Sequence, residues 1–592
     1  MPSVSIKYVA EGEQAEISTD QLTPGWAELR RACEERALGL SNKSETSFVM
    51  AWWELLSIRE TLRYFLNKHG LTLQADNKAA ELLKSAASKE ANYSATPVAV
   101  TAEALAAKLG AEGFVRQLTT QQSRNVLAIT PRVAAAEFSV PGAGKTTSAL
   151  AYFAYHKTAE SKLLIVCPKN AFPVWEEQLA ICFPQRGLKF QRLRGGASNI
   201  KKLMEDPFDV AVVSYHQFAT ARREMGELLG KHQVIAILDE SHRIKGGTDM
   251  KTGNAVLALS YLPYRKLVLS GTPLPNAIGD LVPQFKFLYP EVRADEDNVA
   301  DLIHPIYVRT TKAELGLPPV TRRIREIPMS SAQRQLYEAL RSETFRQGLK
   351  GFNASDRNKL RALGRSVMRL LQVASNTALL ARSELGHYDL FQQVAQEGDS
   401  PKIEYVCGRA RELAKAGRKV VIWSTFVGNV ELIAQRLADL GADFIHGAVE
   451  AGSDTEEDTR EGKIRRFHLD PGAFVLVANP AACAESISLH TVCHDAIYLD
   501  RSYNAAQYLQ SEDRIHRLGL PPETKTNVEV VVCPDSIDEM VDVSLKRKVA
   551  TMARILDDSS LHIETVSPDF DDAEDIGLDK TDIDALIDHL RA

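Results

Sequence analysis

The chain has 592 residues, of which 44% are hydrophobic and 25% are charged, a composition typical of globular proteins. This length predicts about three to five domains in place of one hydrophobic core. No apolar run reaches the roughly 20 residues of a membrane span, and the N-terminus lacks the pattern of a signal peptide. We therefore expect a cytoplasmic protein with no membrane partner.

The net charge of −6 is unevenly distributed along the chain. From Asp557 to the end there are twelve acidic and two basic residues, a net of −10, so the rest of the chain, −6 less −10, carries +4. A mildly basic body with an acidic tail is compatible with nucleic-acid binding. The seven cysteines form no C-x-x-C pair, which predicts buried thiols in a reducing compartment and no zinc site.

Residues 1–110 contain no recognisable motif and are expected to form an accessory module. Residues 4–9 alternate as a strand does, and residues 14–18 are suited to be its hairpin partner. Residues 48–66 carry apolar side chains at helical spacing, which predicts a helix with two tryptophans in its core. The polar, alanine-rich run 85–97 is interpreted as a linker.

The stretch from Phe138 to Thr147 reads FSVPGAGKTT and lies between a predicted strand (133–138) and a predicted helix (148–153). This is the context of a phosphate-binding loop, in which glycines let backbone N–H groups turn onto phosphate oxygens. Lys145 would reach the β- and γ-phosphates of ATP, and the Thr146 hydroxyl would bind Mg²⁺. Ser139 replaces the first glycine of the usual pattern; the alternative interpretation is an ordinary glycine-rich turn. The predicted nucleotide-binding residues of the loop are Pro141, Gly142, Ala143, Gly144, Lys145, Thr146 and Thr147.

Four more apolar strands follow, and helices alternate with them. This alternation predicts an α/β fold with a parallel sheet covered by helices on both faces, and with ligands at the carboxyl ends of the strands. Asp239 and Glu240 fall at such an end, where Asp239 would hold Mg²⁺ through a water and Glu240 would polarise the attacking water. The segment Ser270-Gly271-Thr272 falls at another. The predicted strands are 162–168, 209–215, 233–238 and 265–269.

A second α/β pattern begins near residue 401 and has no phosphate loop, so a second lobe is expected to supply groups across a cleft. Arg514 and Arg517 are predicted at i and i+3 on one helical face, which suits the spread charge of a phosphoryl transition state. The alternative is a surface helix with salt bridges. Residues 326–400 are predicted to be a helical, basic insertion, either a solvated face or a surface for a phosphate backbone.

Together these motifs resemble the ATPases of helicase superfamily two, and within it the SWI/SNF-like translocases that act on double-stranded DNA. The resemblance covers about residues 115–550 and implies two tandem RecA-like lobes, here residues 111–325 and 401–556, followed by an acidic tail (557–592). The sequences that carry it are Cys167-Pro168 followed by Trp175, DESHRIK (239–245), SGTPLPN (270–276), DRSYN (500–504) and DRIHRLG (513–519).

The resemblance implies a role for each matched residue. Gln122 would contact adenine, while Lys145, Asp239, Glu240, Arg514 and Arg517 would be catalytic. It also implies that Ser270, Gly271 and Thr272 couple hydrolysis to lobe movement, and that Ser214, Thr425, Ser486 and Ser488 face the DNA backbone. The chain departs from the family at residues 482–489, where ACAESISL replaces a glycine-rich segment.

We therefore expect a compact prokaryotic or phage ATPase that translocates on double-stranded DNA, uses ATP and Mg²⁺, and is nucleoid-associated when bound to DNA. It would serve in DNA repair, transcription or anti-phage defence. The alternatives are a strand-separating helicase or branched-DNA remodeller, and an ATP-gated subunit that binds partners in a larger complex. Residues 1–110 and the acidic tail are the expected contacts with protein partners.

Overall fold

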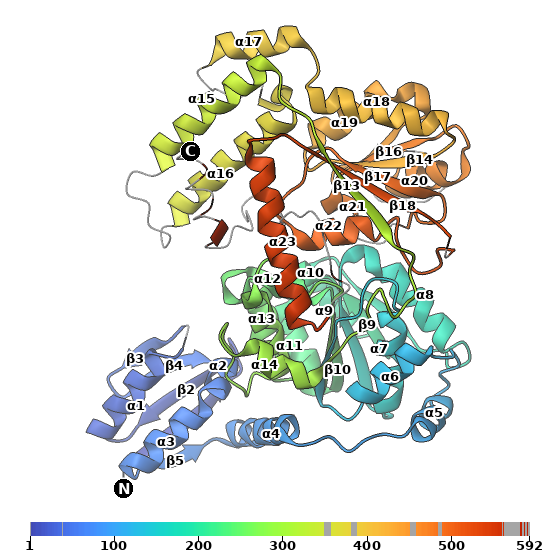
Figure 1. Cartoon of the computed structure of the whole chain (residues 1–592). Coiled ribbons are helices and arrows are strands. Elements are labelled where there is room, and N and C mark those ends of the chain that lie inside the picture. The colour runs from blue at the N-terminus through green and yellow to red at the C-terminus, as the bar shows by residue number, and fades with distance from the viewer. Residues whose placement is uncertain are drawn as a thin grey trace. The chain divides into compact units, whose positions relative to one another are not determined.

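The computed structural model describes residues 2–37, 39–348, 357–380, 387–449, 458–483, 488–521, 523–558, 561, 581, 582, 585 and 589, with only the backbone for 344–348, 357–363 and 483. The chain divides into two compact units (Figure 1). The first comprises residues 1–274 and 278–310, and the second comprises 275–277 and 311–592.

The first unit begins with a small α+β module built on a five-stranded sheet, ordered β3-β4-β2-β1-β5. The predicted hairpin is confirmed, because β1 and β2 pair antiparallel. The helix predicted over 48–66 is wrong at its start: residues 47–51 form strand β4, which pairs with β2. Trp52 and Trp53 are buried as expected. The elements are β1 (Ser3–Val9), β2 (Gln14–Thr19), α1 (Pro24–Glu34), β3 (Ser41–Ser44), β4 (Ser47–Ala51), α2 (Trp52–Ser57), α3 (Arg59–His69) and β5 (Thr72–Ala75).

Helix α4 (Asn77–Ser94) stands where most of the linker was predicted, so that interpretation is wrong. The Asp76 side chain caps the helix by accepting from the Ala79 N–H at 2.7 Å. Alanines are strong helix formers, and the helix docks on the first lobe. Lys89 Nζ donates to the Tyr261 carbonyl at 2.8 Å, and the Tyr93 hydroxyl donates to the Leu302 carbonyl at 2.8 Å.

The first lobe is built on a seven-stranded sheet ordered β12-β6-β11-β10-β7-β9-β8, in which every pair is parallel. Its central strands are continuous apolar runs because both faces are covered, as is typical of such sheets. The strands are β6 (Ala134–Glu137), β7 (Ser161–Val166), β8 (Phe190–Leu193), β9 (Val210–Val213), β10 (Gln233–Asp239), β11 (Arg265–Leu269) and β12 (Tyr307–Val308).

One core of the first lobe packs the sheet against helices α5 to α8, with Leu150, Phe153 and Trp175 among its largest side chains. The helices of this lobe are α5 (Ala102–Ala111), α6 (Thr120–Ile129), α7 (Lys145–His156), α8 (Phe172–Cys182), α9 (Gly196–Leu203), α10 (Tyr215–Thr220), α11 (Arg222–Lys231), α12 (Lys251–Ala258), α13 (Leu281–Leu288) and α14 (Val299–Ile303).

The second unit contains a six-stranded sheet ordered β13-β18-β17-β14-β16-β15, again parallel throughout. Helices α18 and α19 pack on one face, and α20 and α22 pack on the other. The elements are β13 (Val320–Glu326), α18 (Pro401–Lys415), β14 (Lys419–Trp423), α19 (Val427–Arg436), β15 (Asp443–Ile445), α20 (Arg460–Leu469), β16 (Val475–Ala478), α21 (Pro480–Cys483), β17 (Cys493–Tyr498), α22 (Ala505–Glu512) and β18 (Thr526–Val532).

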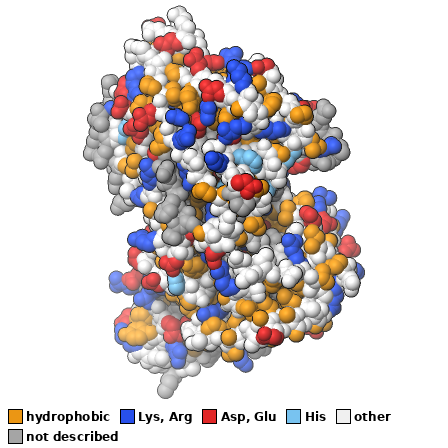
Figure 2. Space-filling view, turned by 45° about the vertical axis from the view of Figure 1, so that its right-hand side comes forward, with side chains coloured by type: hydrophobic (Ala, Val, Ile, Leu, Met, Phe, Trp, Pro, Cys, Tyr) orange, Lys and Arg blue, Asp and Glu red, His pale blue; other side chains and the backbone are white. Residues whose placement is uncertain are grey.

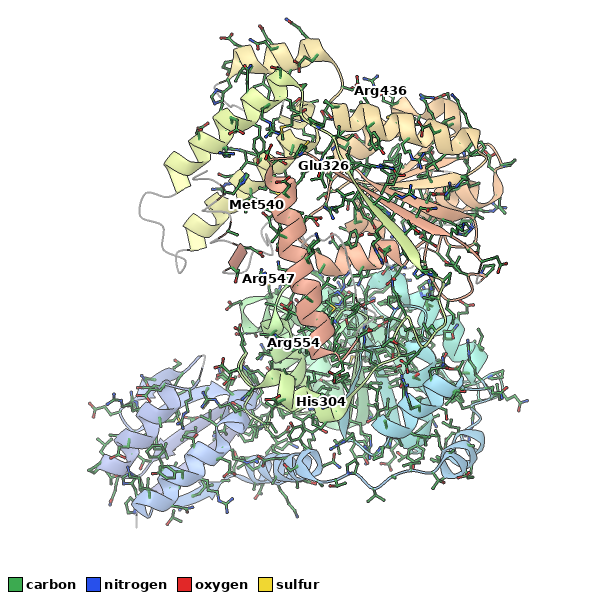
Figure 3. The ribbon with its side chains drawn as sticks, viewed as in Figure 1. His304, Glu326, Arg436, Met540, Arg547 and Arg554 are labelled. Atoms are coloured by element: carbon green, nitrogen blue, oxygen red, sulfur yellow. The ribbon has the colours of Figure 1, made fainter. Side chains whose placement is uncertain are left out.

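Beside this sheet, four helices share a separate apolar core that includes Leu336, Leu370 and Val541. They are α15 (Ser331–Gly348), α16 (Arg357–Ser375), α17 (Tyr388–Glu397) and α23 (Ile537–Ile555). Met540, Arg547 and Arg554 follow one another along α23 (Figure 3). Much of the predicted basic surface and most of the acidic tail lie outside the described residues.

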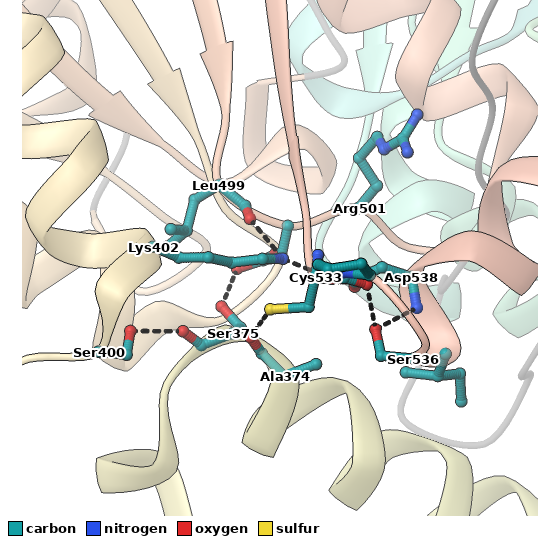
Figure 4. A network of polar contacts seen from close by, with 12 residues as sticks. Ala374, Ser375, Ser400, Lys402, Leu499, Arg501, Cys533, Ser536 and Asp538 are labelled. Atoms are coloured by element: carbon teal, nitrogen blue, oxygen red, sulfur yellow. Dashed lines mark hydrogen bonds and ion pairs between the residues drawn. The ribbon is translucent and has the colours of Figure 1, made fainter. Parts of the chain in front are cut away.

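A buried ion pair joins elements of the second unit (Figure 4). Lys402 Nζ, at the start of α18, lies 2.6 Å from Asp538 Oδ2 and 3.2 Å from the Leu499 carbonyl oxygen. The same Asp538 oxygen accepts from the Cys533 N–H at 2.9 Å. Because the aspartate is paired and hydrogen-bonded, its burial is compensated.

The predicted fold class is confirmed: two tandem RecA-like lobes with parallel sheets, a helical insertion and a small N-terminal α+β module. None of the described helices is both long and apolar enough to cross a membrane.

Candidate nucleotide-binding site

The phosphate loop connects β6 to α7, and helix α7 begins at Lys145. Gly142 and Gly144 have φ angles of 89° and 83°, a region that glycine adopts without strain. A Cβ atom on Gly144 would lie 2.0 Å from Gln122 Nε2, so a side chain there would displace the Gln122 amide. The amides of the first turn of α7 are suited to bind an anion, and Lys145 and Thr146 are both partly exposed at this end.

Gln122 supports the loop from the first turn of α6. Its Oε1 accepts from the Thr119 N–H at 3.0 Å, which closes a capping box. Its Nε2 donates to the carbonyls of Ala143 and Gly144 at 3.3 and 3.5 Å. The side chain is buried, and its contact with adenine stays a prediction.

A buried polar network lies beneath the loop and accounts for the serine in place of the first glycine. Ser139 Oγ donates to Glu137 Oε1 at 3.1 Å and accepts from Asn125 Nδ2 at 3.2 Å and the Thr310 N–H at 3.0 Å. Glycine would leave these partners without that hydroxyl. Burial raises the pKa of Glu137 to about 7, although the nearby Lys145 charge opposes the shift. Lys145 Nζ itself donates to the Ser139 carbonyl at 2.8 Å.

Asp239 ends β10, and three neighbours fix its orientation. Trp175 Nε1 donates to Asp239 Oδ2 at 2.9 Å, and the Glu240 N–H donates to Oδ1 at 3.0 Å. The Tyr215 hydroxyl donates to the backbone carbonyl of Asp239 at 2.8 Å. Burial, followed by the charge of Glu240, raises the pKa of Asp239 to about 6. An oriented carboxylate beside a threonine-bearing phosphate loop is the donor chemistry that Mg²⁺ prefers.

Glu240 has φ 52° and ψ 53°, a left-handed conformation that is strained for a residue with a side chain. Its Oε2 lies 3.4 Å from His242 Nδ1, and the same nitrogen lies 3.1 Å from Ser270 Oγ. The Thr272 N–H donates to Ser270 Oγ at 3.2 Å. A histidine therefore links Glu240 to the predicted coupling segment.

The predicted coupling segment, residues 270–272, also touches the phosphate loop. A Cβ atom on Gly271 would lie 2.9 Å from Pro141 Cδ, which is too close for any other residue. The Ser270 N–H donates to the Glu137 carbonyl at 3.2 Å. The first lobe thus brings together the loop, the carboxylate pair and the coupling segment, whereas Thr147 is buried on the core side of α7.

In the second unit, the prediction that Arg514 and Arg517 share a helical face is wrong. Helix α22 ends at Glu512, and the two arginines lie in the turn that follows. The turn is held at several points: Arg322 pairs with Glu512 through two bonds of 2.9 and 2.6 Å, and His516 Nε2 lies 2.6 Å from the Pro318 carbonyl oxygen. Burial acts to raise the pKa of Glu512, but the positive charges of Arg322 and Lys312 have the larger combined effect and lower this pKa to about 2.

The predicted nucleic-acid residues have varied surroundings. Ser214 is buried and caps α10 by accepting from the Gln217 N–H at 3.3 Å. The Thr425 N–H donates to Asp500 Oδ1 at 2.6 Å. Ser488 is held by two histidines, with its Oγ 2.8 Å from His490 Nδ1 and its carbonyl oxygen 2.8 Å from His468 Nε2. Ser486 lies outside the described residues, and the DNA contacts of all four stay predictions.

On the face shown in Figure 2, basic and acidic side chains lie interspersed. The described side chains of that face therefore form no extended patch of a single sign.

Sequence reasoning missed several residues that support the site. Glu137 could have been found from the sequence, because it is a charged residue in an otherwise apolar strand. Nothing in the local sequence marks Asn125, Thr310, Lys312 or Arg322, because their partners are distant in sequence.

Residues 139–298 match the model of the SNF2-related domain. An ISWI chromatin-remodeling complex ATPase of Arabidopsis thaliana is 28% identical over 466 residues, covering 71% of this chain and 40% of that protein. A putative ATP-dependent helicase/translocase of Bacillus subtilis is 25% identical over 440 residues, covering 69% and 45%. The chain thus spans less than half the length of these curated relatives.

Among solved structures, the SWI2/SNF2 ATPase core of Sulfolobus solfataricus in complex with double-stranded DNA covers 75% of this chain and 92% of its own at 21% identity, with a TM-score of 0.32. The family model and the curated relatives confirm the resemblance to the SWI/SNF-like ATPases of superfamily two. The chain carries an SNF2-related domain that contains the phosphate loop and the carboxylate pair.

Proposed function

We propose that the chain is an ATP-dependent translocase that acts on double-stranded DNA. The observation that carries the proposal is the convergence in the first lobe of the phosphate loop, the Asp239-Glu240 pair and the Ser270-Gly271-Thr272 segment. Gly271 packs against Pro141, and His242 joins Glu240 to Ser270. A nucleotide-binding loop that contacts a coupling segment suits a motor, in which the state of the nucleotide has to reach the rest of the protein.

Each residue of the site then has a role. Lys145 and the N–H groups at the start of α7 bind the phosphates, and Thr146 with Asp239 would hold Mg²⁺. The metal ion would neutralise charge on the phosphates. Trp175 orients Asp239, while Glu240 positions the attacking water. Gln122 keeps the loop in place through the carbonyls of Ala143 and Gly144.

Arg514 and Arg517 are proposed to stabilise the transition state, a role worth roughly 10³–10⁵ in rate for arginine fingers. The Glu512–Arg322 and His516–Pro318 contacts anchor the chain on either side of Arg514, and Arg517 follows directly. Double-stranded DNA as the substrate rests on the family resemblance, and Ser214, Thr425, Ser486 and Ser488 are the proposed backbone contacts. Roles in repair, transcription or anti-phage defence stay predictions, as do protein partners of residues 1–110 and the tail.

The experiment compares ATP hydrolysis without nucleic acid and with duplex DNA, single-stranded DNA or RNA, with Lys145→Ala as the control. Strong stimulation by duplex DNA that is lost in Lys145→Ala supports the translocase. Preference for single strands or forks, with release of a labelled strand, indicates the helicase. Hydrolysis that no nucleic acid changes rules out the motor and leaves the partner-gated subunit.

A further inference from the structure

The chain passes from the end of the first unit to the main part of the second through a short segment that is anchored at both ends. The first unit ends at Thr310 and the main part of the second begins at Thr311. Residues 309–312, called the connector here, follow directly after β12. Thr310 makes its contacts within the first unit, and Lys312 makes its contacts within the second.

At its first end, the connector is bonded to the phosphate loop. The Thr310 N–H donates to Ser139 Oγ at 3.0 Å, and the Val140 N–H donates to the Thr310 carbonyl at 3.0 Å. Asn125 Nδ2 donates to Thr310 Oγ1 at 3.0 Å. Thr310 is only 1% exposed, so a displacement of the loop at Ser139 and Val140 has to displace Thr310 as well.

At its other end, the connector is bonded to the turn that carries Arg514. Lys312 Nζ lies 2.5 Å from Asp513 Oδ1 and 3.7 Å from Glu512 Oε1. The lysine side chain is 17% exposed, whereas the two carboxylates are 4% and 0% exposed. Charged pairs with so little solvent are weakly screened, and Asp513 is the residue directly before Arg514.

We propose that the connector couples the phosphate loop to the Arg514 turn, and that Lys312 is the positioning residue for Arg514. Two residues of chain span at most about 7 Å, so covalent geometry leaves little slack between Thr310 and Lys312 in any orientation of the units. Movement of the phosphate loop on binding nucleotide is therefore transmitted to Asp513. This inference rests on the proposed function, because it assigns Arg514 a part in hydrolysis.

If Lys312 only stabilised the second unit, its loss would affect kcat no more than the loss of a similar buried lysine elsewhere in that unit. The second unit contains such a lysine as a matched control. Lys463 Nζ lies 2.6 Å from Asp443 Oδ1, with side-chain exposures of 12% and 11%. This pair resembles Lys312–Asp513 in type and burial but involves neither the connector nor the arginine turn. Lys463→Met thus reports the cost of losing a largely buried lysine in the same unit.

The experiment measures kcat, KM and melting temperature for Lys312→Met, Lys312→Arg, Asp513→Asn, the double variant Lys312→Met/Asp513→Asn and Lys463→Met in the full chain. Because misplacement of a catalytic group by about 1 Å can cost about 100-fold in rate, we expect Lys312→Met to lower kcat about 10- to 100-fold with KM within twofold.

The other variants separate positioning from stability. Lys312→Arg should restore part of the rate, and the double variant should be no slower than the slower single variant. Lys463→Met should keep the wild-type kcat. Equal kcat in Lys312→Met and Lys463→Met overturns the inference. So does a double variant whose loss of kcat is the product of the losses in the two single variants.

A second measurement does not depend on turnover. Hydrogen exchange of residues 511–518 is followed with and without a non-hydrolysable ATP analogue, in the wild type and in a variant with two glycines inserted between Thr311 and Lys312. The control carries the same insertion after Gly187, in an exposed loop. We expect the analogue to change exchange of the turn in the wild type and the control, and that response to be lost in the connector variant.

An unchanged response in the connector variant, or no response in the wild type, overturns the coupling. If the wild type hydrolyses no ATP but its exchange response depends on the connector, the proposed function fails and the coupling stands. If the wild type hydrolyses ATP and the connector variants behave as it does, the proposed function stands and the coupling fails.

Discussion

The Trp175 indole N–H donates to the Asp239 carboxylate at 2.9 Å. Trp175 lies on α8 and is almost fully buried, so the ring position is fixed by the core of the first lobe. One carboxylate oxygen is engaged by the indole and the other by the Glu240 N–H. The tryptophan that follows Cys167-Pro168 thus holds a carboxylate of the proposed nucleotide site from a neighbouring helix.

Replacing Trp175 with phenylalanine should weaken the response to Mg²⁺. Phenylalanine keeps much of the packing but loses the donor, and loss of such a supporting contact typically costs about 10- to 100-fold in metal affinity or activity. The measurement is the Mg²⁺ concentration that gives half-maximal hydrolysis. Tyr215→Phe is the control, because its hydroxyl bonds the Asp239 backbone and not the carboxylate. Equal shifts in the two variants would contradict a specific role for the indole.

Replacing Glu137 with glutamine should change how stability depends on pH. The pKa of Glu137 is raised to about 7 in the folded protein, so the folded state binds this proton more tightly than the unfolded state does. That contribution to stability is complete below the unfolded pKa and is lost as pH rises through the folded pKa, between about 4.5 and 7. Glutamine stays neutral and keeps an acceptor for Ser139.

The free energy of unfolding that the wild type loses between these two pKa values is about 3 kcal/mol, because the pKa of Glu137 rises from 4.5 to about 7 and one pKa unit is worth about 1.4 kcal/mol. Melting temperatures of Glu137→Gln and the wild type are compared at pH 5 and pH 8. The variant should gain stability relative to the wild type at the higher pH. A difference that does not vary with pH would show that Glu137 does not titrate in this range.

Local patterns are enough to predict the phosphate loop and the strand that ends at Asp239. In both places the signal is contained in a few adjacent residues: glycines before a lysine, or an apolar run before two acids. The burial of both sheet faces makes the central strands visible as apolar runs. The two lobes are predicted by two successive patterns of alternating apolar strands and helices, and the family resemblance implies the same division.

The parts that sequence reasoning missed depend on distant partners. Strand β13 reads VTRRIRE and is mostly exposed at a sheet edge, so no apolar pattern marks it. The sequence predicts a helix that continues through Arg517, whereas contacts of Glu512 with Arg322 and of His516 with Pro318 hold a turn there. Only Glu137, a single charge in an apolar strand, offers a local signal for the network beneath the loop.

Replacing Ser270 with alanine should reduce the DNA-stimulated rate of hydrolysis. The hydroxyl oxygen lies 3.1 Å from His242 Nδ1 and also accepts from the Thr272 N–H, and a hydrogen bond contributes about 0.5–1.5 kcal/mol. We expect a decrease of about 2- to 10-fold in stimulated kcat. Ser241→Ala is the control, because that buried hydroxyl donates to Gln284 at 2.6 Å. Combining Ser270→Ala with His242→Phe should add little if the pair acts together, and independent losses would argue against the link.

Replacing Lys402 with methionine should destabilise the second unit strongly. The side chain is 1% exposed and pairs with Asp538 at 2.6 Å, so methionine leaves a buried carboxylate without its cation. Loss of one partner of a buried pair costs about 3–5 kcal/mol.

The control is Arg436→Met, which removes the more exposed Arg436–Asp399 pair, where a loss of about 0–1 kcal/mol is typical. Urea unfolding followed by Trp423 fluorescence, in a background lacking the other tryptophans, compares the midpoints. Similar midpoints for the two variants would show that water or a neighbouring group compensates Asp538, and the network of Figure 4 would then contribute little to stability.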